Sequence, residues 1–368
     1  MATLCENLKT MKNINPAVDV RKDLVYKPEY MINSFFAIGH FEAKGHTLNY
    51  LLHMISMGNP GCEFIASMFS VTDETEQKYY SDTQIFPINS ETVSFDEFYL
   101  KAPHGQMSGD IDEMKLSAGM KNAKLDVKIY PQGYPIFNGG TGCFHMVNLD
   151  IYQYSIPHCK TIGTLVLDGE IYELDGMTWF DRQWQIPCPK LGNVGRKFMG
   201  WAVKTFMDGG KKVNFPSWGW MDMNLDNGEV ISVWFPVEKT GEDCWATVMH
   251  PDGTQKKVKL NPIIAQAENW WKSSVSDYAY PTKYHVQCPE LDADLTVICA
   301  PKEQELNFEG WPTLSHYEGA SQVSGIYGGQ KVTGYCYVET IGVWNEKMLM
   351  MLRISQYDIQ LTLLPVTE

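Results

Sequence analysis

Four dipeptides typical of tight hairpins constrain the fold of this chain more than any other feature. They are Asp168-Gly169, Asn227-Gly228, Asp252-Gly253 and Gly328-Gly329, and each separates two short segments of strand-like sequence. These residue types tolerate positive φ, so each pair is expected to form a two-residue type I′ turn between antiparallel strands. Helical periods are few by comparison. The pattern predicts an all-β, mainly antiparallel fold whose sheets close into barrels or sandwiches.

Two segments, 196–206 and 265–274, are the ones that we expect to form short helices. The stretch 187–195 is rich in Pro and Gly, and it is the best candidate for a boundary between domains. A length of 368 residues, 44% of them hydrophobic, suffices for two ordinary domains. We therefore expect an N-terminal barrel over 1–195 and a C-terminal barrel over 196–368, with a linker helix and an extended C-terminal tail.

The composition excludes several classes of partner. The net charge of -14 argues against nucleic acid and anionic membrane surfaces. No apolar run is long enough to span a bilayer, and residues 1–12 lack the apolar core of a secretory signal. Nine cysteines without a CxxC pair predict reduced thiols and a cytoplasmic location. No Cys/His cluster has the spacing of zinc ligands, so neither a metal site nor another cofactor is expected.

The run from Trp179 to Trp184 carries the most specific chemical signal. It places Asp181 between two indoles and beside Arg182. Indoles lower the local dielectric and favour the neutral acid, whereas Arg182 would favour the ionised form if it turned toward the carboxylate. An acid among aromatic faces can protonate an unactivated alkene or enol and stabilise the resulting cation. The same residues also suit a buried Asp–Arg pair at a barrel rim, surrounded by two core tryptophans.

Four ordered blocks of sequence resemble the family of carotenoid 1,2-hydratase (hydroxyneurosporene synthase) and kievitone hydratase. They span about 28 to 342 and contain Pro28-Glu29-Tyr30 with Gly39-His40-Phe41, then Tyr154-Ser155-Ile156-Pro157 with Trp179–Trp184, then Trp218-Gly219-Trp220, and finally Tyr317-Glu318-Gly319 with Gly334–Glu339. The resemblance implies two joined lipocalin-like barrels with a few short helices. It also implies a cofactor-independent hydratase that adds water to an alkene of a hydrophobic terpenoid or prenylated substrate.

The resemblance and the aromatic setting together give the candidate site residues. Asp181 is the candidate acid. The candidate cation-stabilising faces are Trp179, Trp184 and Trp220, and the groups that could position water or relay a proton are Tyr154, Tyr337 and His158. Tyr317 lies in a matching block and is a candidate contact for the substrate.

Glu318 and Glu339 form a second tier of candidates. Carboxylates in otherwise apolar strands are seldom buried without partners. They could act as proton acceptors that face the pocket, with Glu318 the stronger catalytic candidate. The alternative is a hydrogen-bonding or ion-pair role between the barrels, with Arg182 or Arg196. A structural role is favoured for His40 and His53. His145, His285 and His316 carry no motif of known chemistry, apart from the closeness of His316 to Glu318 in the sequence.

The chain departs from the family pattern at several positions. Gln183 stands where a glutamate is usual, Tyr30-Met31 replaces paired tryptophans, Gly219 replaces an aspartate, and Tyr317 replaces a tryptophan. These changes imply a divergent pocket and substrate. A cofactor-free cyclase or isomerase of the pericyclase kind, such as a Diels-Alderase, is therefore one alternative, and a non-catalytic carrier of a hydrophobic small molecule is another. We expect the pocket at the seam between the barrels, because ligand sites favour domain interfaces.

Overall fold

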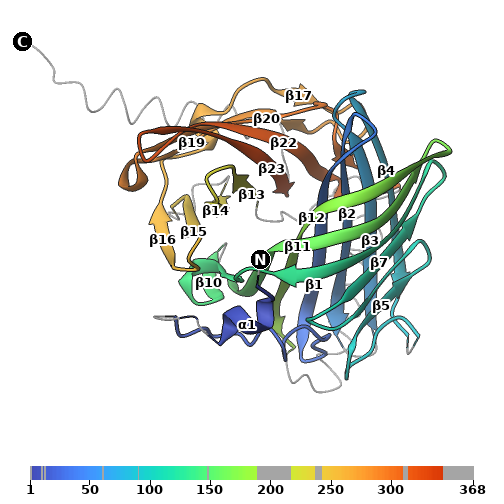
Figure 1. The fold of residues 1–368 in the computed structure, drawn as a ribbon. Helices are drawn as coiled ribbons and strands as arrows, with labels where there is room; N and C mark the ends of the chain where they lie inside the picture. Colours follow the sequence, from blue (N-terminus) through green and yellow to red (C-terminus); the bar gives the residue numbers. More distant parts are fainter. Residues whose placement is uncertain are drawn as a thin grey trace, which may run out of the picture.

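The computed structural model describes residues 2–9, 11, 14–59, 62–89, 91–146, 149–188, 217–236, 243–309 and 314–342. In this part of the chain two large sheets lie side by side, and each curves strongly into a near-barrel (Figure 1). Every ladder is antiparallel, so the predicted all-β class is confirmed. None of the helices described is long and apolar enough to cross a membrane.

The first sheet follows the short helix α1 (Leu4–Leu8) and has the order β4-β3-β2-β1-β12-β11-β8-β7-β6-β5, with β9 and β10 also paired to β11. Its strands are β1 (Tyr30–Ala43), β2 (His46–Asn59), β3 (Cys62–Asp73), β4 (Lys78–Pro87), β5 (Phe98–Ala102), β6 (Gly105–Gly109), β7 (Met114–Gly119), β8 (Ala123–Gln132), β9 (Ile136–Phe137), β10 (Cys143–Met146), β11 (Leu149–Leu167) and β12 (Glu170–Pro187).

The second sheet has the order β16-β15-β14-β13-β23-β22-β20-β19, with β21 paired to β22. Its strands are β13 (Trp218–Leu225), β14 (Val230–Pro236), β15 (Trp245–Met249), β16 (Gln255–Lys259), β19 (Lys283–Cys288), β20 (Ala293–Cys299), β21 (Glu305–Leu306), β22 (His316–Tyr327) and β23 (Gln330–Ile341). A separate pair is formed by β17 (Trp271–Lys272) and β18 (Ala279–Tyr280), and short 3-10 turns cover Asn138–Gly140, Ile264–Gln266 and Pro289–Leu291. The division into domains at 195 stays a prediction, because 189–216 lie outside the described residues.

All four predicted turns lie between paired antiparallel strands, but only two of them have the predicted length. Asp168-Gly169 and Gly328-Gly329 are two-residue turns with positive φ at both positions (49° and 87°, 57° and 74°). The other two predictions of turn length are wrong. At Gly228 and Gly253 only the glycine has positive φ (88° and 85°), so a longer loop closes around each.

The helix predicted over 265–274 is also wrong. A 3-10 turn ends at Gln266, Asn269 takes a positive φ of 54°, and the chain then enters β17. A residue in the left-handed region cannot continue a right-handed helix. Instead Trp271 stacks on Tyr280 of β18 with ring centroids 6.2 Å apart. The helix predicted over 196–206 lies outside the described residues.

Several central strands, among them β1 and β13–β15, are buried on both faces, and this positions the site. One apolar cluster consists only of residues from the first part of the chain, and a second only of residues from the second sheet and its loops. A third cluster joins the two sheets through their opposite faces. We call this contact region the seam. Trp220 of β13 lies at its centre, with its ring 5.5 Å from Phe36 and 5.8 Å from Trp179.

Candidate functional site

A cavity of about 260 Å³ lies within the seam. Most of its lining is apolar, and both sheets contribute to it, with Phe36, Asp181 and Gln183 on one side and Trp220, Trp234 and Glu339 on the other. No lysine or arginine lines it among the described residues. A cavity with an apolar wall and a few convergent polar groups is the usual form of a small-molecule site.

Strand register explains why the polar residues converge. On the first sheet, Ser155, Asp181, Phe36 and His53 are direct cross-strand partners in adjacent strands. On the second sheet, Trp234, Trp220, Glu339 and Glu318 form a similar row. Cross-strand partners project from the same face of a sheet. The two rows therefore face each other across the seam.

Asp181 is buried and receives several hydrogen bonds. Trp179 Nε1 donates to Oδ1 at 2.7 Å, and Gln153 Nε2 donates to Oδ2 at 2.9 Å. Burial raises the pKa of Asp181 to about 7, and hydrogen bonds from Ser155, Trp179 and Gln153 keep it from rising further. The carboxyl can therefore hold or release a proton near neutral pH, as a general acid requires.

The sequence left two roles open for Arg182: turning toward Asp181 and favouring its ionised form, or forming a buried structural pair with it. The structure shows neither arrangement. Arg182 points to the opposite face of β12, where its guanidinium donates to the carbonyl oxygens of Asp23, Val25 and Ser34 and to Asn33 Oδ1. Adjacent residues of a strand project to opposite faces, so a pair between neighbours in sequence is geometrically unfavourable here. Arg182 ties down the segment before β1, and no lysine or arginine in the described part of the chain lies at Asp181 in its place.

Aromatic rings surround the carboxyl of Asp181. Trp179 and Trp220 meet edge to face at 68°, and Phe36 is edge-on to Trp220 at 88°. Trp218 and Trp234 also line the cavity, and the Nε1 atoms of both have no hydrogen-bond partner among the described residues. The wall thus offers π faces to a cation, together with two indole donors that a ligand oxygen could use.

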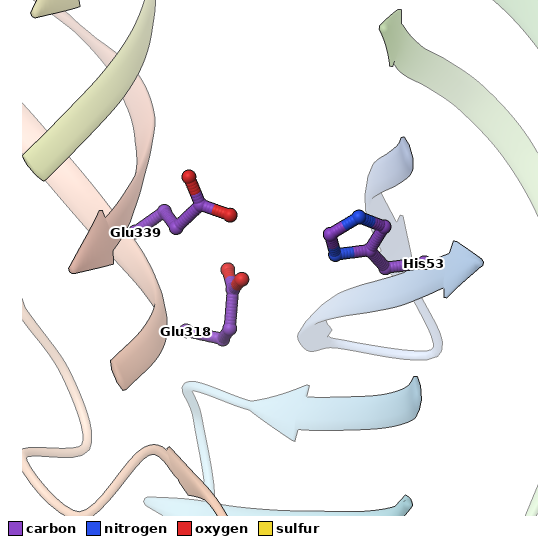
Figure 2. A group of neighbouring side chains, drawn as sticks. All are labelled: His53, Glu318 and Glu339. Carbon is purple, nitrogen blue, oxygen red and sulfur yellow. The ribbon is translucent and has the colours of Figure 1, made fainter. Parts of the chain in front are cut away.

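A second polar group takes its two carboxyl groups from the second sheet, across the seam from Asp181, and its imidazole from β2 of the first sheet. His53, Glu318 and Glu339 each place one ligand atom within 4.8 Å of the others, and the ring and the two carboxyl groups point toward a common space (Figure 2). Glu339 and His53 line the cavity, whereas Glu318 is fully buried behind them. Burial raises the pKa of both glutamates well above the usual range and lowers that of His53 to about 3.

The structure separates the other predicted site residues from this cavity. Tyr154 and Trp184 belong to the interior cluster of the first sheet, where Tyr154 donates to Val20 O at 3.1 Å and Trp184 stacks on Tyr152. Tyr317 lies inside the second near-barrel, and His158 lines a different cavity of about 640 Å³. Their predicted contacts with a substrate in the seam therefore lack support from their positions.

The placement of the remaining candidates is mixed. Tyr337 lies in the seam cluster, with its ring 6.4 Å from Phe36. His40 has the structural setting that we expected, since its Nδ1 is 2.8 Å from Asn49 Oδ1 and its ring stacks on Tyr335. His53 and His316 both line the cavity.

Sequence reasoning missed several residues at the seam. Gln153, Trp218 and Trp234 carry no chemical motif, and they reach the cavity only because their strands align with Asp181 and Trp220. Asp222 is buried next to this region, and its carboxyl accepts a hydrogen bond from the backbone of Tyr337. Burial raises the pKa of Asp222 well above the usual range.

A family model described as AttH-like matches residues 17–343. The chain belongs to the AttH-like family. Within solved structures, the AttH-like fold is shared with an AttH protein of Nitrosomonas europaea (TM-score 0.73, 18% identity, 91% of this chain and 100% of the other). It is also shared with kievitone hydratase of Nectria haematococca (TM-score 0.70, 16% identity, covering 90% of this chain and 97% of the other).

Two curated relatives of this AttH-like chain have named activities. Dehydratase asqC of Emericella nidulans is 24% identical over 266 residues, covering 66% of this chain and 67% of the relative. Kievitone hydratase of Fusarium solani subsp. phaseoli is 20% identical over 295 residues, covering 72% and 76%. The predicted resemblance to kievitone hydratase is confirmed. The matches support an enzyme of the lyase class and argue against the non-catalytic carrier.

Proposed function

We propose that this enzyme adds water to, or removes it from, a carbon–carbon double bond of a hydrophobic terpenoid or prenylated small molecule held in the seam cavity. Asp181 is the general acid. The observation that carries this proposal is the position of Asp181, a buried carboxyl with a pKa near 7 on the wall of an aromatic cavity. A group of that kind supplies protons at neutral pH where an ordinary surface aspartate would be ionised.

In the hydration direction, the Asp181 proton is transferred to an alkene carbon, and a carbocation forms on the neighbouring carbon. The faces of Trp179 and Trp220 stabilise that cation by about 2 kcal/mol or more for each desolvated face. Water adds to the cation, and the proton that it loses restores Asp181. Dehydration is the same path in reverse, with Asp181 protonating the leaving hydroxyl. The proton transfer from Asp181 needs no organic cofactor. The cytoplasmic location stays a prediction.

The direct test is mass spectrometry of products from a panel of prenylated and polyene substrates incubated with the enzyme in oxygen-18 water. Gain of one labelled water supports hydration, and loss of one water supports dehydration. A product of unchanged mass with a new retention time would overturn the lyase proposal in favour of the cyclase or isomerase, for which Gln183 at the cavity wall would polarise the substrate by hydrogen bonding. Absence of any product with Asp181→Asn, against turnover in the wild type, ties the reaction to the seam.

A further inference from the structure

A polar group at the cavity wall has few hydrogen-bond donors among the described residues. Within them, Nδ1 of His53, Nε2 of His316 and both carboxyl oxygens of Glu318 are buried without a hydrogen bond from a backbone amide, a hydroxyl or a side-chain amide, and the polar neighbours of Glu318 are the Glu339 carboxyl and His316 Nε2 at 3.4 Å. All three side chains are more than nine-tenths buried, at 5%, 6% and 0% exposure. Leaving a buried polar atom without a partner costs about 1–3 kcal/mol, and more if the group is charged. Four such atoms close together need either a bound cation or a proton shared between the two carboxyl groups.

The tautomers agree with a bound cation. His316 Nδ1 is 2.7 Å from the carbonyl oxygen of Leu314, which can only accept, so Nδ1 carries the proton and the Nε2 lone pair faces Glu318 Oε1 at 3.4 Å. His53 Nε2 is 2.8 Å from Ser34 Oγ, and donation to that hydroxyl leaves the Nδ1 lone pair directed at the glutamates (Figure 2). A histidine that ligates a metal commonly donates its other N–H to an oxygen in this way.

Glu305, another buried carboxylate in the second sheet, is hydrogen-bonded by several donors. Glu305 accepts hydrogen bonds from the hydroxyls of Ser273, Ser276 and Tyr280. In the part of the chain that the structure describes, Glu318 has no such shell of hydroxyl donors, although it is more deeply buried. The fold can therefore surround a buried glutamate with hydroxyl donors, and it does not do so here.

We propose that His53, Glu318 and Glu339 bind one divalent first-row transition-metal ion at the wall of the seam cavity. One imidazole nitrogen with two carboxylate oxygens suits Zn²⁺, Mn²⁺, Fe²⁺ or Co²⁺, whereas Mg²⁺ and Ca²⁺ prefer all-oxygen sites and soft ions prefer thiolates. Two carboxylates and a neutral imidazole carry a charge that a divalent ion balances. Glu318 closes the rear of the site, and Glu339 and His53 reach the cavity, so the open coordination position faces a bound small molecule.

Three protein ligands with an open position are typical of catalytic rather than structural sites. This site lies in addition to Asp181 and takes both of its carboxylates from the other sheet, so the acid assignment does not depend on it. It would, however, overturn the expectation that the enzyme works without a metal. That expectation rested on the spacing of Cys and His along the sequence, whereas these ligands come from β2, β22 and β23.

The test is metal analysis of the purified full-length protein, followed by removal of metal with a chelator and titration with Co²⁺. We expect close to one transition-metal ion per chain, visible Co²⁺ absorption bands, and a higher Tm for the reconstituted than for the metal-free protein. Glu339→Gln should weaken Co²⁺ affinity at least about 100-fold, because loss of a direct ligand exceeds the 10–100-fold cost of losing an outer-shell partner. Glu173→Gln, on an exposed part of β12, is the matched control and should bind normally.

Two results would overturn the proposal. One is a wild-type protein whose Tm and absorption do not respond to Zn²⁺, Mn²⁺, Fe²⁺ or Co²⁺, together with a Glu339→Gln variant that is as stable as the wild type or more so; the two carboxyl groups would then share a proton. The other is unchanged Co²⁺ binding in His53→Ala and Glu339→Gln, which would place the ion elsewhere. None of these measurements uses a substrate, so they are independent of the outcome for Asp181.

Discussion

Two buried acidic centres face the same cavity from opposite sheets, and their surroundings differ. Asp181 receives hydrogen bonds from Trp179 and Gln153, and its pKa is raised only to about 7. Among the described residues no hydroxyl, amide or indole donates to Glu318, and burial raises its pKa well above the usual range, opposed only by a hydrogen bond with the Glu339 carboxyl. Burial alone does not make a proton donor. Donors that partly stabilise the carboxylate bring its pKa to a value at which a proton can be exchanged, whereas a carboxylate without donors needs a cation or must stay neutral.

The largest expected effect is on turnover by Asp181→Asn. The amide cannot donate an acidic proton, so kcat/KM should fall by about 10²–10⁴-fold, which is the usual contribution of a general acid. The fold should persist, because the asparagine Oδ1 can still accept from Trp179, and the free Oε1 of Gln153 can accept from the new amide after a side-chain flip. Steady-state kinetics measure kcat/KM, and circular dichroism reports whether the fold persists.

The matched control is Asp175→Asn, which makes the same substitution on the same strand at an exposed position. It should leave turnover unchanged. If Asp181→Asn keeps near-normal kcat/KM, Asp181 is not the general acid. The different surroundings of Asp181 and Glu318 would then have a cause other than acid catalysis.

The second effect is on stability as a function of pH. The pKa of Asp181 is about 7 in the folded state and about 3.9 in the unfolded state. The contribution of this group to the free energy of unfolding is therefore most favourable below pH ~4 and is lost as the pH rises from ~4 to ~7. The loss is at most about 4 kcal/mol, from about three pKa units at 1.36 kcal/mol each. Urea denaturation of wild type and Asp181→Asn at several pH values measures it. A wild-type curve parallel to that of the variant between pH ~4 and ~7 would rule out a raised pKa.

Much of this comparison could be predicted from the sequence, and the exceptions have identifiable causes. Glu318 and Glu339 lie equally far before and after the predicted turn at Gly328-Gly329, so their pairing follows from that turn. The partner of Asp181 does not follow from Asp168-Gly169 in the same way. A register shift between Ile156 and Cys159 moves the pairing of Ser155 by one position, and a bulge of this kind has no clear sequence signal.

The predicted placement of Trp184 differs for another reason. Two residues separate Asp181 from Trp184, so strand alternation sends them to opposite faces, whereas Trp179 shares the face of Asp181. Local sequence patterns also could not predict that the two sheets meet at the seam, because that contact depends on how two rows of residues from distant strands pack. The aromatic composition predicted a wide apolar pocket without locating it.

Trp184→Leu tests the separation of the two faces. Trp184 is buried in the interior cluster, stacked on Tyr152 at 5.6 Å and 5.1 Å from the Arg182 guanidinium. Its replacement should lower the free energy of unfolding by about 2–3 kcal/mol, as expected for a large-to-small change in a core, while KM stays close to the wild-type value. Chemical denaturation and steady-state kinetics report the two. A selective rise in KM with unchanged stability would return Trp184 to the substrate site.

The smallest effect concerns the donors that distinguish Asp181 from Glu318. Acid catalysis should be lost as pH rises through about 7 in the wild type, because the proton leaves Asp181. Trp179→Phe keeps a ring in the wall but removes the Nε1 donor that lies 2.7 Å from Oδ1 and lowers the pKa of Asp181. The alkaline limb of kcat/KM should therefore move to higher pH, by up to about one unit, since a hydrogen bond to a charged group contributes about 1.5–3 kcal/mol before relaxation. The position of the limb is the relevant measurement, because loss of the indole face lowers the rate at every pH. A limb that stays at the wild-type pH would mean that the Trp179 donor does not set the proton affinity of Asp181, and that the contrast with Glu318 rests on Gln153 and Ser155 instead.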